Sequence, residues 1–145
     1  MANEIQTYRN HARFHPPFHF VLAPIVLIHF FWTAKVFYAS PTWYTGEMLM
    51  LAVGLVIMAF LTRISALAAQ DRTIRLEERL RFERLLAPDV AARAGDLKVG
   101  QIVALRFASD GEVPGLVSQL LSGKLTTQKE IKQAIVNWRP DYCRV

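Results

Sequence analysis

Two apolar stretches decide the fold of this chain: Phe18–Tyr38, FHFVLAPIVLIHFFWTAKVFY, and Met48–Ala69, MLMLAVGLVIMAFLTRISALAA. The hydrocarbon core of a bilayer is about 30 Å thick, and a helix of about 20 mostly apolar residues crosses it. Both stretches are close to that length, and nothing comparable follows them in the 145 residues. The sequence therefore predicts two membrane spans, at about residues 18–38 and 47–69, followed by a tail that lies in water.

Charged residues are distributed unevenly along the chain. Few occur before Gln70, and most follow it. This asymmetry indicates two regions in different solvents, lipid first and water second. The net charge is +5, but the excess arginines flank the spans and no nucleic-acid-binding motif accompanies them. We therefore expect the lipid bilayer, and not nucleic acid, as a partner.

The positions of the positive charges predict the topology. The connection between the spans, 39–47, contains neither lysine nor arginine, whereas arginines precede the first span and follow the second: Arg9, Arg13, Arg63, Arg72, Arg75 and Arg79. Positively charged flanks stay on the cytoplasmic side. Both termini of this multi-pass protein should therefore be cytoplasmic. The single cysteine, Cys143, cannot form an internal disulfide, which fits that compartment.

The second span has no strong helix breaker before Pro88, so we expect it to continue into water as one long helix. Leu67, Ile74, Phe82 and Leu85 share one face of that helix and should pack against something. Oppositely charged residues four apart should pair on its surface: Asp71–Arg75, Glu77–Arg81 and Arg79–Glu83. The predicted organisation is a polar arm (1–17), a transmembrane hairpin (18–69), a cytoplasmic helix extension (70–87) and a small helical cytoplasmic region (88–145).

Three short helices are predicted in the tail. One covers 99–108. The second starts at a capping box of Ser109 and Glu112 and ends at Gly123, and the third starts at a capping box of Thr127 and Glu130 and extends to Trp138. About 55 residues form a poor core alone. We therefore expect the tail to dock on the apolar face of the long helix.

Aromatic and basic residues gather near the predicted membrane boundaries. Tryptophan and tyrosine favour the headgroup level, and long basic side chains reach toward it from nearby positions. The predicted interface anchors are Trp32, Lys35, Tyr38, Trp43, Tyr44 and Arg63.

His29 lies inside the first span, where an ionisable residue is a functional hypothesis by default. A neutral imidazole there could ligate a haem or a chlorophyll-type pigment, or hydrogen-bond to a neighbouring helix. We favour the hydrogen bond, with no cofactor. His11, His15 and His19 are four apart and could ligate a metal, but Pro16 and Pro17 interrupt their helix, so no metal site is predicted.

Two groups of residues could dock a protein partner. One lies on the long helix (Arg72, Arg75 and Arg79) and one near the C-terminus (Trp138, Arg139 and Tyr142). Exposed tryptophan, tyrosine and arginine dominate many interfaces. The alternatives are a solvated helix face for the first group and, for the second, a clasp on the tail in which Arg139 pairs with Asp141.

Four strings occur together in order: NHARFHPPFHF, QDRTIRLEERLRFERLL, IVALRFASD and NWRPDY. In this combination the chain resembles a bacterial family of small two-span membrane proteins classed as a domain of unknown function. The resemblance covers nearly the whole chain. It implies location in the bacterial cytoplasmic (inner) membrane and a helical tail, and it carries no catalytic residues.

The sequence therefore predicts an all-α membrane protein: a two-helix transmembrane hairpin, a second span that continues into a long cytoplasmic helix, and a small helical tail. It contains no nucleophile elbow, phosphate loop or HExxH motif, so we expect no enzyme. The expected role is an accessory or scaffold subunit, bound to itself or to other membrane protein subunits, for example of a respiratory or photosynthetic energy-transducing complex. The alternative is a His-ligated tetrapyrrole- or metal-binding membrane subunit.

Overall fold

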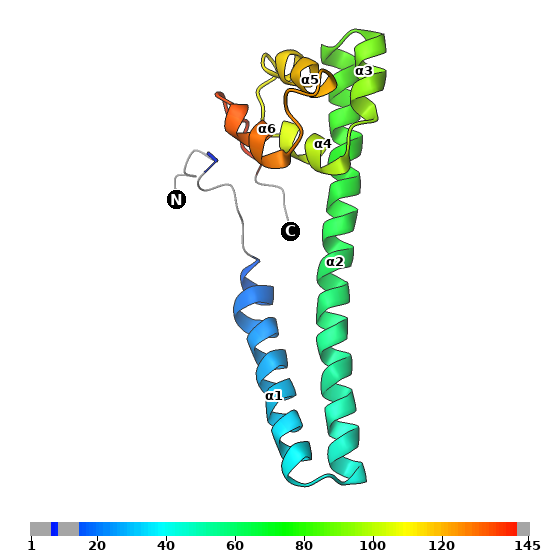
Figure 1. The fold of residues 1–145 in the computed structure, drawn as a ribbon, viewed down its shortest axis with the longest axis vertical. Coiled ribbons are helices and arrows are strands. Elements are labelled where there is room, and N and C mark those ends of the chain that lie inside the picture. The colour runs from blue at the N-terminus through cyan, green and yellow to red at the C-terminus, as the bar shows by residue number, and fades with distance from the viewer. Residues whose placement is uncertain (1–6, 9–14, 142–145) are drawn as a thin grey trace. The chain divides into compact units, whose positions relative to one another are not determined.

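The computed structural model describes residues 7–8 and 15–141, and these residues are helical with no strands beyond one isolated bridge between Ala108 and Trp138. The elements are a π-helix η1 (Pro17–Leu22) and the α-helices α1 (Ala23–Ala39), α2 (Trp43–Leu85), α3 (Pro88–Gly95), α4 (Val99–Leu105), α5 (Val113–Leu121) and α6 (Gln128–Ala134) (Figure 1). The contacts divide the chain after Ala68. We describe the apolar unit (15–68) and the tail unit (69–141, with Thr7 and Tyr8) separately.

The apolar unit begins with an irregular helix. The expected α-helical start at Phe18 is instead a π-helical segment from Pro17 to Leu22, in which the amide of Ala23 donates to the carbonyl of Phe18. Pro24 follows directly and has no amide hydrogen to donate, so it cannot form the normal α-helical bond at this point. Local π-helical geometry is one of the recognised adjustments to such an interruption.

The connection between α1 and α2 is much shorter than the predicted 39–47. It consists of Ser40–Thr42, because α2 already begins at Trp43. Thr42 and Thr45 cap the helix reciprocally: the Thr45 amide donates to Thr42 Oγ1 at 3.2 Å, and the Thr42 amide donates to Thr45 Oγ1 at 2.9 Å. Gly46 lies within the first turn and does not interrupt the helix.

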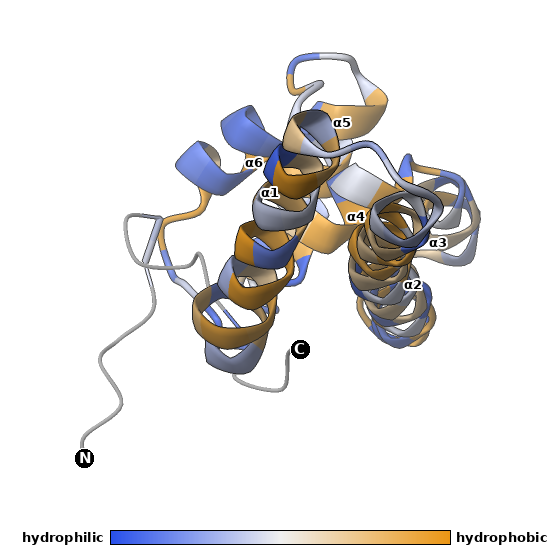
Figure 2. Ribbon diagram, turned by 90° about the horizontal axis from the view of Figure 1, so that it is seen from below, coloured by the Kyte–Doolittle hydropathy of each residue, from blue (hydrophilic) through white to orange (hydrophobic). Residues whose placement is uncertain are grey.

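Within the apolar unit, few side chains are buried. The buried residues are Val26, Thr33 and Ala52, whereas large apolar residues such as Phe20 (68%), Ile28 (69%), Phe31 (66%) and Met50 (71%) are exposed. Hydrophobic segments recur along α1 and α2 (Figure 2). The continuous helical segment Pro17–Ala39, made of η1 and α1, and helix α2 are long and apolar enough to cross a membrane, by length and composition.

The tail unit has a compact core to which α2 contributes. Phe82 of α2 is fully buried with Ile102, Leu105, Phe107 and Ile131, and Leu85 packs against this cluster. Ile74, on the same face of α2, is 6% exposed. The apolar face of the long helix therefore has the packing partner that its spacing predicts. Leu67, the first residue predicted for that face, is 38% exposed.

Two predicted helix ends in the tail are wrong. Helix α4 ends at Leu105 rather than at 108, and α6 ends at Ala134, so Trp138 lies outside it. Helix α2 ends at Leu85, before Pro88 as expected, and Pro88 begins a further helix, α3, that was not predicted; proline is favoured in the first turn of a helix. The predicted box at Thr127 and Glu130 is confirmed, and Gly123 follows α5 with a φ of 77°.

Ser109 and Glu112 do not form the expected capping box. The Ser109 hydroxyl donates to Glu112 Oε2 at 2.9 Å, and the Glu112 carboxylate also accepts from the amides of Val136 (3.0 Å) and Asn137. The carboxylate therefore holds the segment after α6 instead of capping its own helix.

Candidate functional site

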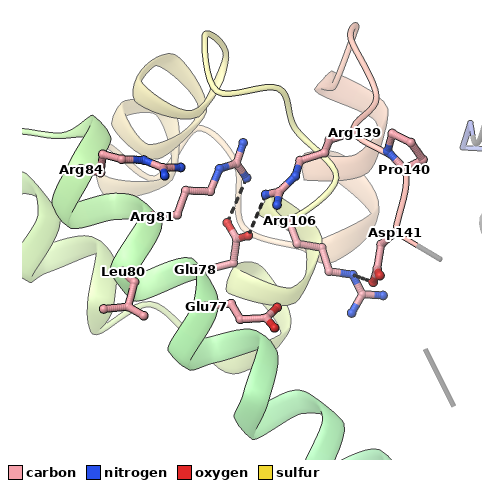
Figure 3. Close-up of a pocket in the computed structure, with 9 residues that line it drawn as sticks. All are labelled: Glu77, Glu78, Leu80, Arg81, Arg84, Arg106, Arg139, Pro140 and Asp141. Atoms are coloured by element: carbon pink, nitrogen blue, oxygen red, sulfur yellow. Dashed lines mark hydrogen bonds and ion pairs between the residues drawn. The ribbon is translucent and has the colours of Figure 1, made fainter. Parts of the chain in front are cut away.

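A cleft of about 510 Å³ in the tail unit gathers most of the unit's buried charge (Figure 3). Helix α2 contributes four charged residues and a leucine, α4 is followed by one arginine, and the C-terminal segment contributes the rest. The lining residues are Glu77, Glu78, Leu80, Arg81, Arg84, Arg106, Arg139, Pro140 and Asp141.

Arg81 is the most heavily bonded residue at this site, with a side chain only 4% exposed. Its Nε donates to Asp110 Oδ1 at 2.7 Å, its Nη2 to the Ala108 carbonyl at 2.7 Å, and its Nη1 to Glu78 Oε2 at 3.1 Å. A planar guanidinium can satisfy several acceptors in this way. One side chain thus fastens α2 to the loop between α4 and α5.

Glu78 is buried beside Arg81, at 3% exposure, and its Oε1 lies 3.5 Å from Arg139 Nη1. Burial raises the pKa of Glu78, because removal from water disfavours the carboxylate; Arg81 and Arg139 oppose this rise without cancelling it. The hydrogen bond from Arg81 lowers the pKa of Asp110, which is 56% exposed. The pKa of Glu78 therefore lies above the ordinary value of a glutamate, and the pKa of Asp110 lies below that of an aspartate.

The C-terminal segment, residues 138–141, is bonded to the same cleft. The Arg139 amide donates to the Phe107 carbonyl at 2.7 Å, and the Trp138 ring packs on the Phe107 ring at 5.1 Å between centroids. Asp141 pairs with Arg106 at 3.2 Å. The predicted pair of Arg139 with Asp141 is replaced by these two pairs, Arg139–Glu78 and Asp141–Arg106, to other elements (Figure 3).

Hydrogen bonds also change the pKa of Glu112, whose carboxylate binds the segment after α6. Burial alone would raise the pKa of Glu112, but hydrogen bonds from Ser109 and from the amides of Val136 and Asn137 outweigh it and lower the pKa. The charged residues of the cleft join three segments that are distant in sequence: α2, the loop after α4 and the C-terminal segment. The guanidinium groups could also receive an anionic group at the cleft, since Arg84 and Arg139 are 71% and 54% exposed.

The predicted surface pairs on the long helix are not formed as expected. Arg81 bonds to Glu78 and Asp110 instead of Glu77, and Arg79 donates to the Gly95 carbonyl at 2.8 Å instead of pairing with Glu83. Among the residues that the structure describes, Asp71 and Arg75 form no ion pair. Arg79 and Arg81 thus bond to acceptors outside α2, and Arg81 bonds in addition to Glu78 one turn earlier in the same helix.

The structure places the predicted partner-docking residues in different environments. Arg72 is exposed, Arg75 and Arg79 are half-buried, and Trp138 and Arg139 belong to the fastened C-terminal segment. Tyr142 lies outside the described residues. The structure therefore brings Arg139 to the cleft but leaves Arg72 apart from it.

The predicted interface anchors lie in the apolar unit and are largely exposed. Tyr38 and Trp43 are each 91% exposed, Trp32 and Tyr44 are 66% and 67%, and Lys35 is also exposed. Arg63 is half-buried, with its guanidinium carbon 5.7 Å from the Phe18 ring centroid.

His29 is half-buried in α1, and its carbonyl accepts a hydrogen bond from Thr33 Oγ1 at 3.0 Å. Of the three arm histidines, His11 lies outside the described residues, and the His19 ring bonds to the backbone of His15. The described part of the chain holds no group of three or more histidine, cysteine, aspartate or glutamate side chains suited to a metal ion.

Sequence reasoning did not single out Glu78, Arg106 or Asp110. Glu78 could have been suspected, because it lies four residues after Ile74 and four before Phe82 on the apolar face, where a carboxylate needs a partner. Nothing local in the sequence marks Arg106 or Asp110, since their partners lie 35 and 29 positions away.

The chain belongs to the family of unknown function DUF6526, whose model matches residues 1–145. No curated protein and no solved structure matches the chain significantly.

Proposed function

We propose that this chain is a two-span integral protein of the bacterial cytoplasmic membrane that acts as a non-enzymatic accessory or scaffold subunit of a larger membrane assembly. In this proposal, η1, α1 and the part of α2 up to Ala69 form the transmembrane hairpin. The remainder of α2 and the tail unit lie in the cytoplasm, with both termini on that side.

The observation that supports this proposal is the unburied apolar surface. The most apolar 18-residue windows of the two long helices are only 11% and 6% buried. The core helix of a soluble protein has a similar composition but hides its apolar side chains inside the protein. Bilayer lipid covers such surface on all sides of a helix.

The scaffold role is supported by the internal bonding of the tail unit. Its buried charged groups, Arg81, Glu78 and Arg106, hold segments of the unit together. A rigid helical unit attached to a membrane anchor suits the positioning of other subunits. The proposed location alone suggests an energy-transducing complex as the assembly.

Membrane insertion is tested by fractionation. The full chain should sediment with membranes after lysis, stay there through alkaline carbonate, and dissolve only in detergent. A matched pair in the second span, Leu55→Ala and Leu55→Arg, adds a control: a central arginine costs about 2.5–3.5 kcal/mol of insertion free energy, so only Leu55→Arg should reduce membrane recovery. Wild-type protein in the high-speed supernatant would overturn the proposal.

Topology is tested by reporter fusions. A reporter inserted at Trp43 should lie on the opposite side of the membrane from one at the C-terminus, and an N-terminal tag should remain on the mature protein. Reporters on one side, or loss of the N-terminal tag by cleavage, would contradict the hairpin.

The scaffold role is tested by gentle solubilisation and affinity purification, followed by identification of stoichiometric subunits. The preparation should be colourless. A Soret or chlorophyll band that disappears in His29→Ala would instead assign the tetrapyrrole-binding role to this chain.

A further inference from the structure

The C-terminal part of α2 has two very different faces. One face carries Ile74, Glu78, Arg81 and Phe82, which are at most 6% exposed, and its Phe82 lies in the core of the tail unit. The opposite face presents two leucines to solvent, Leu76 at 57% and Leu80 at 68% exposure. Two large apolar side chains one turn apart, in a unit that otherwise has its own core, make a surface that a partner could bury.

The spacing of this face has a recognisable period. Thr73, Leu76, Leu80 and Glu83 are separated by three, four and three residues, as are the a and d positions of a heptad repeat, and all four are exposed. In this register Arg72 takes a g position and Glu77 takes the e position five residues later. The covered residues Ile74, Glu78, Arg81 and Phe82 take b, f, b and c positions, which a coiled-coil partner does not need.

We propose that this face of α2 binds the same face of a second copy of the chain, in parallel and in register, with Leu76 and Leu80 at the centre. Parallel orientation rests on the proposed function, because two copies inserted in one membrane with the same topology must direct this helix the same way. The inference adds a specific partner and a specific surface to that function.

Charge complementarity favours a second copy as the occupant. In a parallel pair of helices, each g residue lies beside the e residue five positions later on the other helix. Arg72 of each copy therefore lies beside Glu77 of the other, which gives two symmetrical ion pairs across Leu76. Both side chains are exposed, and neither forms an ion pair with another residue in the described ranges.

The like-charged g and e residues that follow bond elsewhere within each copy, and Glu83, the next d residue, would face Glu83 of the second copy and ends the apolar seam. Arg79 is the next g residue and would face Arg84 of the second copy. Its guanidinium donates to the Gly95 carbonyl at 2.8 and 3.3 Å, while Arg84 Nη2 lies 4.0 Å from Asp110 Oδ2. The favourable part of the surface therefore runs from Arg72 to Leu80.

Cysteine cross-linking in membranes tests the contact. In a Cys143→Ser background, which removes the only native cysteine, Leu76→Cys and Leu80→Cys should form intermolecular disulfides rapidly upon mild oxidation. The matched control is Ser122→Cys, an exposed position in the same unit. Cross-linking no faster at positions 76 and 80 than at 122 would overturn the proposal.

Charge reversal tests the register. Arg72→Glu and Glu77→Arg should each make both symmetrical pairs repulsive and weaken self-association by about tenfold, whereas the double variant should restore it. Lys124→Glu, an exposed charge change elsewhere in the tail, should leave association unchanged. Single variants that associate like the wild type, or a double variant as weak as the singles, would refute the pairing.

Each variant, with Trp32 and Trp43 replaced by phenylalanine, is also assayed for membrane recovery and for Trp138 fluorescence, which report insertion and folding of the tail. Monomeric protein that still inserts and folds would overturn the dimer and leave the membrane proposal standing. Protein that does not insert would overturn the proposed function itself. The two failures are therefore distinguishable.

Discussion

Arg81 illustrates how burial of a helix face changes the partners of a charged side chain. Glu77 lies four residues before it in the favourable order for a surface pair, worth a few tenths of a kcal/mol. The guanidinium instead turns to Glu78, Asp110 and the Ala108 carbonyl. Charge-assisted bonds in a partly dry environment are stronger than a solvated pair, so burial of this face of α2 decides the partner.

Removal of Arg81 should be costly, because Glu78 would stay buried without its principal partner. Arg81→Met should lower the free energy of unfolding of the tail unit by about 3–5 kcal/mol. The measurement is urea unfolding in detergent, followed by Trp138 fluorescence after Trp32 and Trp43 are replaced by phenylalanine. Arg84→Met, at a residue 71% exposed, is the control and should cost less than about 1 kcal/mol. Equal effects would contradict the assignment.

Glu112 makes the tail sensitive to acid. Its pKa is lowered in the folded state, so the folded protein binds the proton less readily than the unfolded chain. The resulting stability is present above the ordinary value of 4.5 and is lost as the pH falls through the lower folded-state pKa. Glu112→Gln should be less stable than the wild type at neutral pH, and the difference should shrink below 4.5.

Urea unfolding of Glu112→Gln and of the wild type at a series of pH values measures how their difference in stability shrinks. Glu78 works in the opposite direction: its pKa is raised, so its ionisation costs stability as the pH rises above 4.5. A difference between Glu112→Gln and wild type that stays constant with pH would contradict the role of the ionised carboxylate.

At the scale of elements, local capping signals were informative where their partners were local. The Thr127 hydroxyl accepts from the Glu130 amide at 3.2 Å, and the Glu130 carboxylate accepts from the Thr127 amide at 3.1 Å. The same spacing at Ser109 and Glu112 gave a different structure, because the amides after α6 compete for the carboxylate.

The cap at the start of α6 should contribute measurably to the tail. Thr127→Ala should lower the free energy of unfolding by about 1 kcal/mol, since the first amides of the helix lose an acceptor. Ser118→Ala, at an exposed position within α5, is the control and should change it by less than about 0.5 kcal/mol. A Thr127→Ala variant as stable as this control would show that the cap is dispensable.

At the scale of the whole molecule, the tail depends on the end of α2. Phe82 is fully buried in the tail core, and Arg81 bonds to the loop before α5. A fragment of 69–145 should therefore unfold cooperatively, with high ellipticity and a Trp138 emission shift in urea. A fragment of 88–145 lacks both anchors and should show neither. Cooperative unfolding of the shorter fragment would contradict this dependence.

Three features could be predicted from the sequence alone: the chain is helical, two segments are long and apolar enough to cross a membrane, and α2 continues well beyond the second apolar stretch. The sequence also predicted the docking of the tail on the face carrying Ile74, Phe82 and Leu85. These features follow from length, periodicity and helix breakers, which act within one or two turns of the chain.

The hydrogen-bond and ion-pair partners of the polar groups could be identified only from the folded structure. Arg81 and Asp110 are 29 positions apart, Glu112 holds amides 24 and 25 positions later, and Trp138 leaves its predicted helix to pack on Phe107. A buried charge is stabilised by whichever acceptor the fold brings near it. Local sequence cannot specify that choice, because the competing acceptors become neighbours only after the helices have packed.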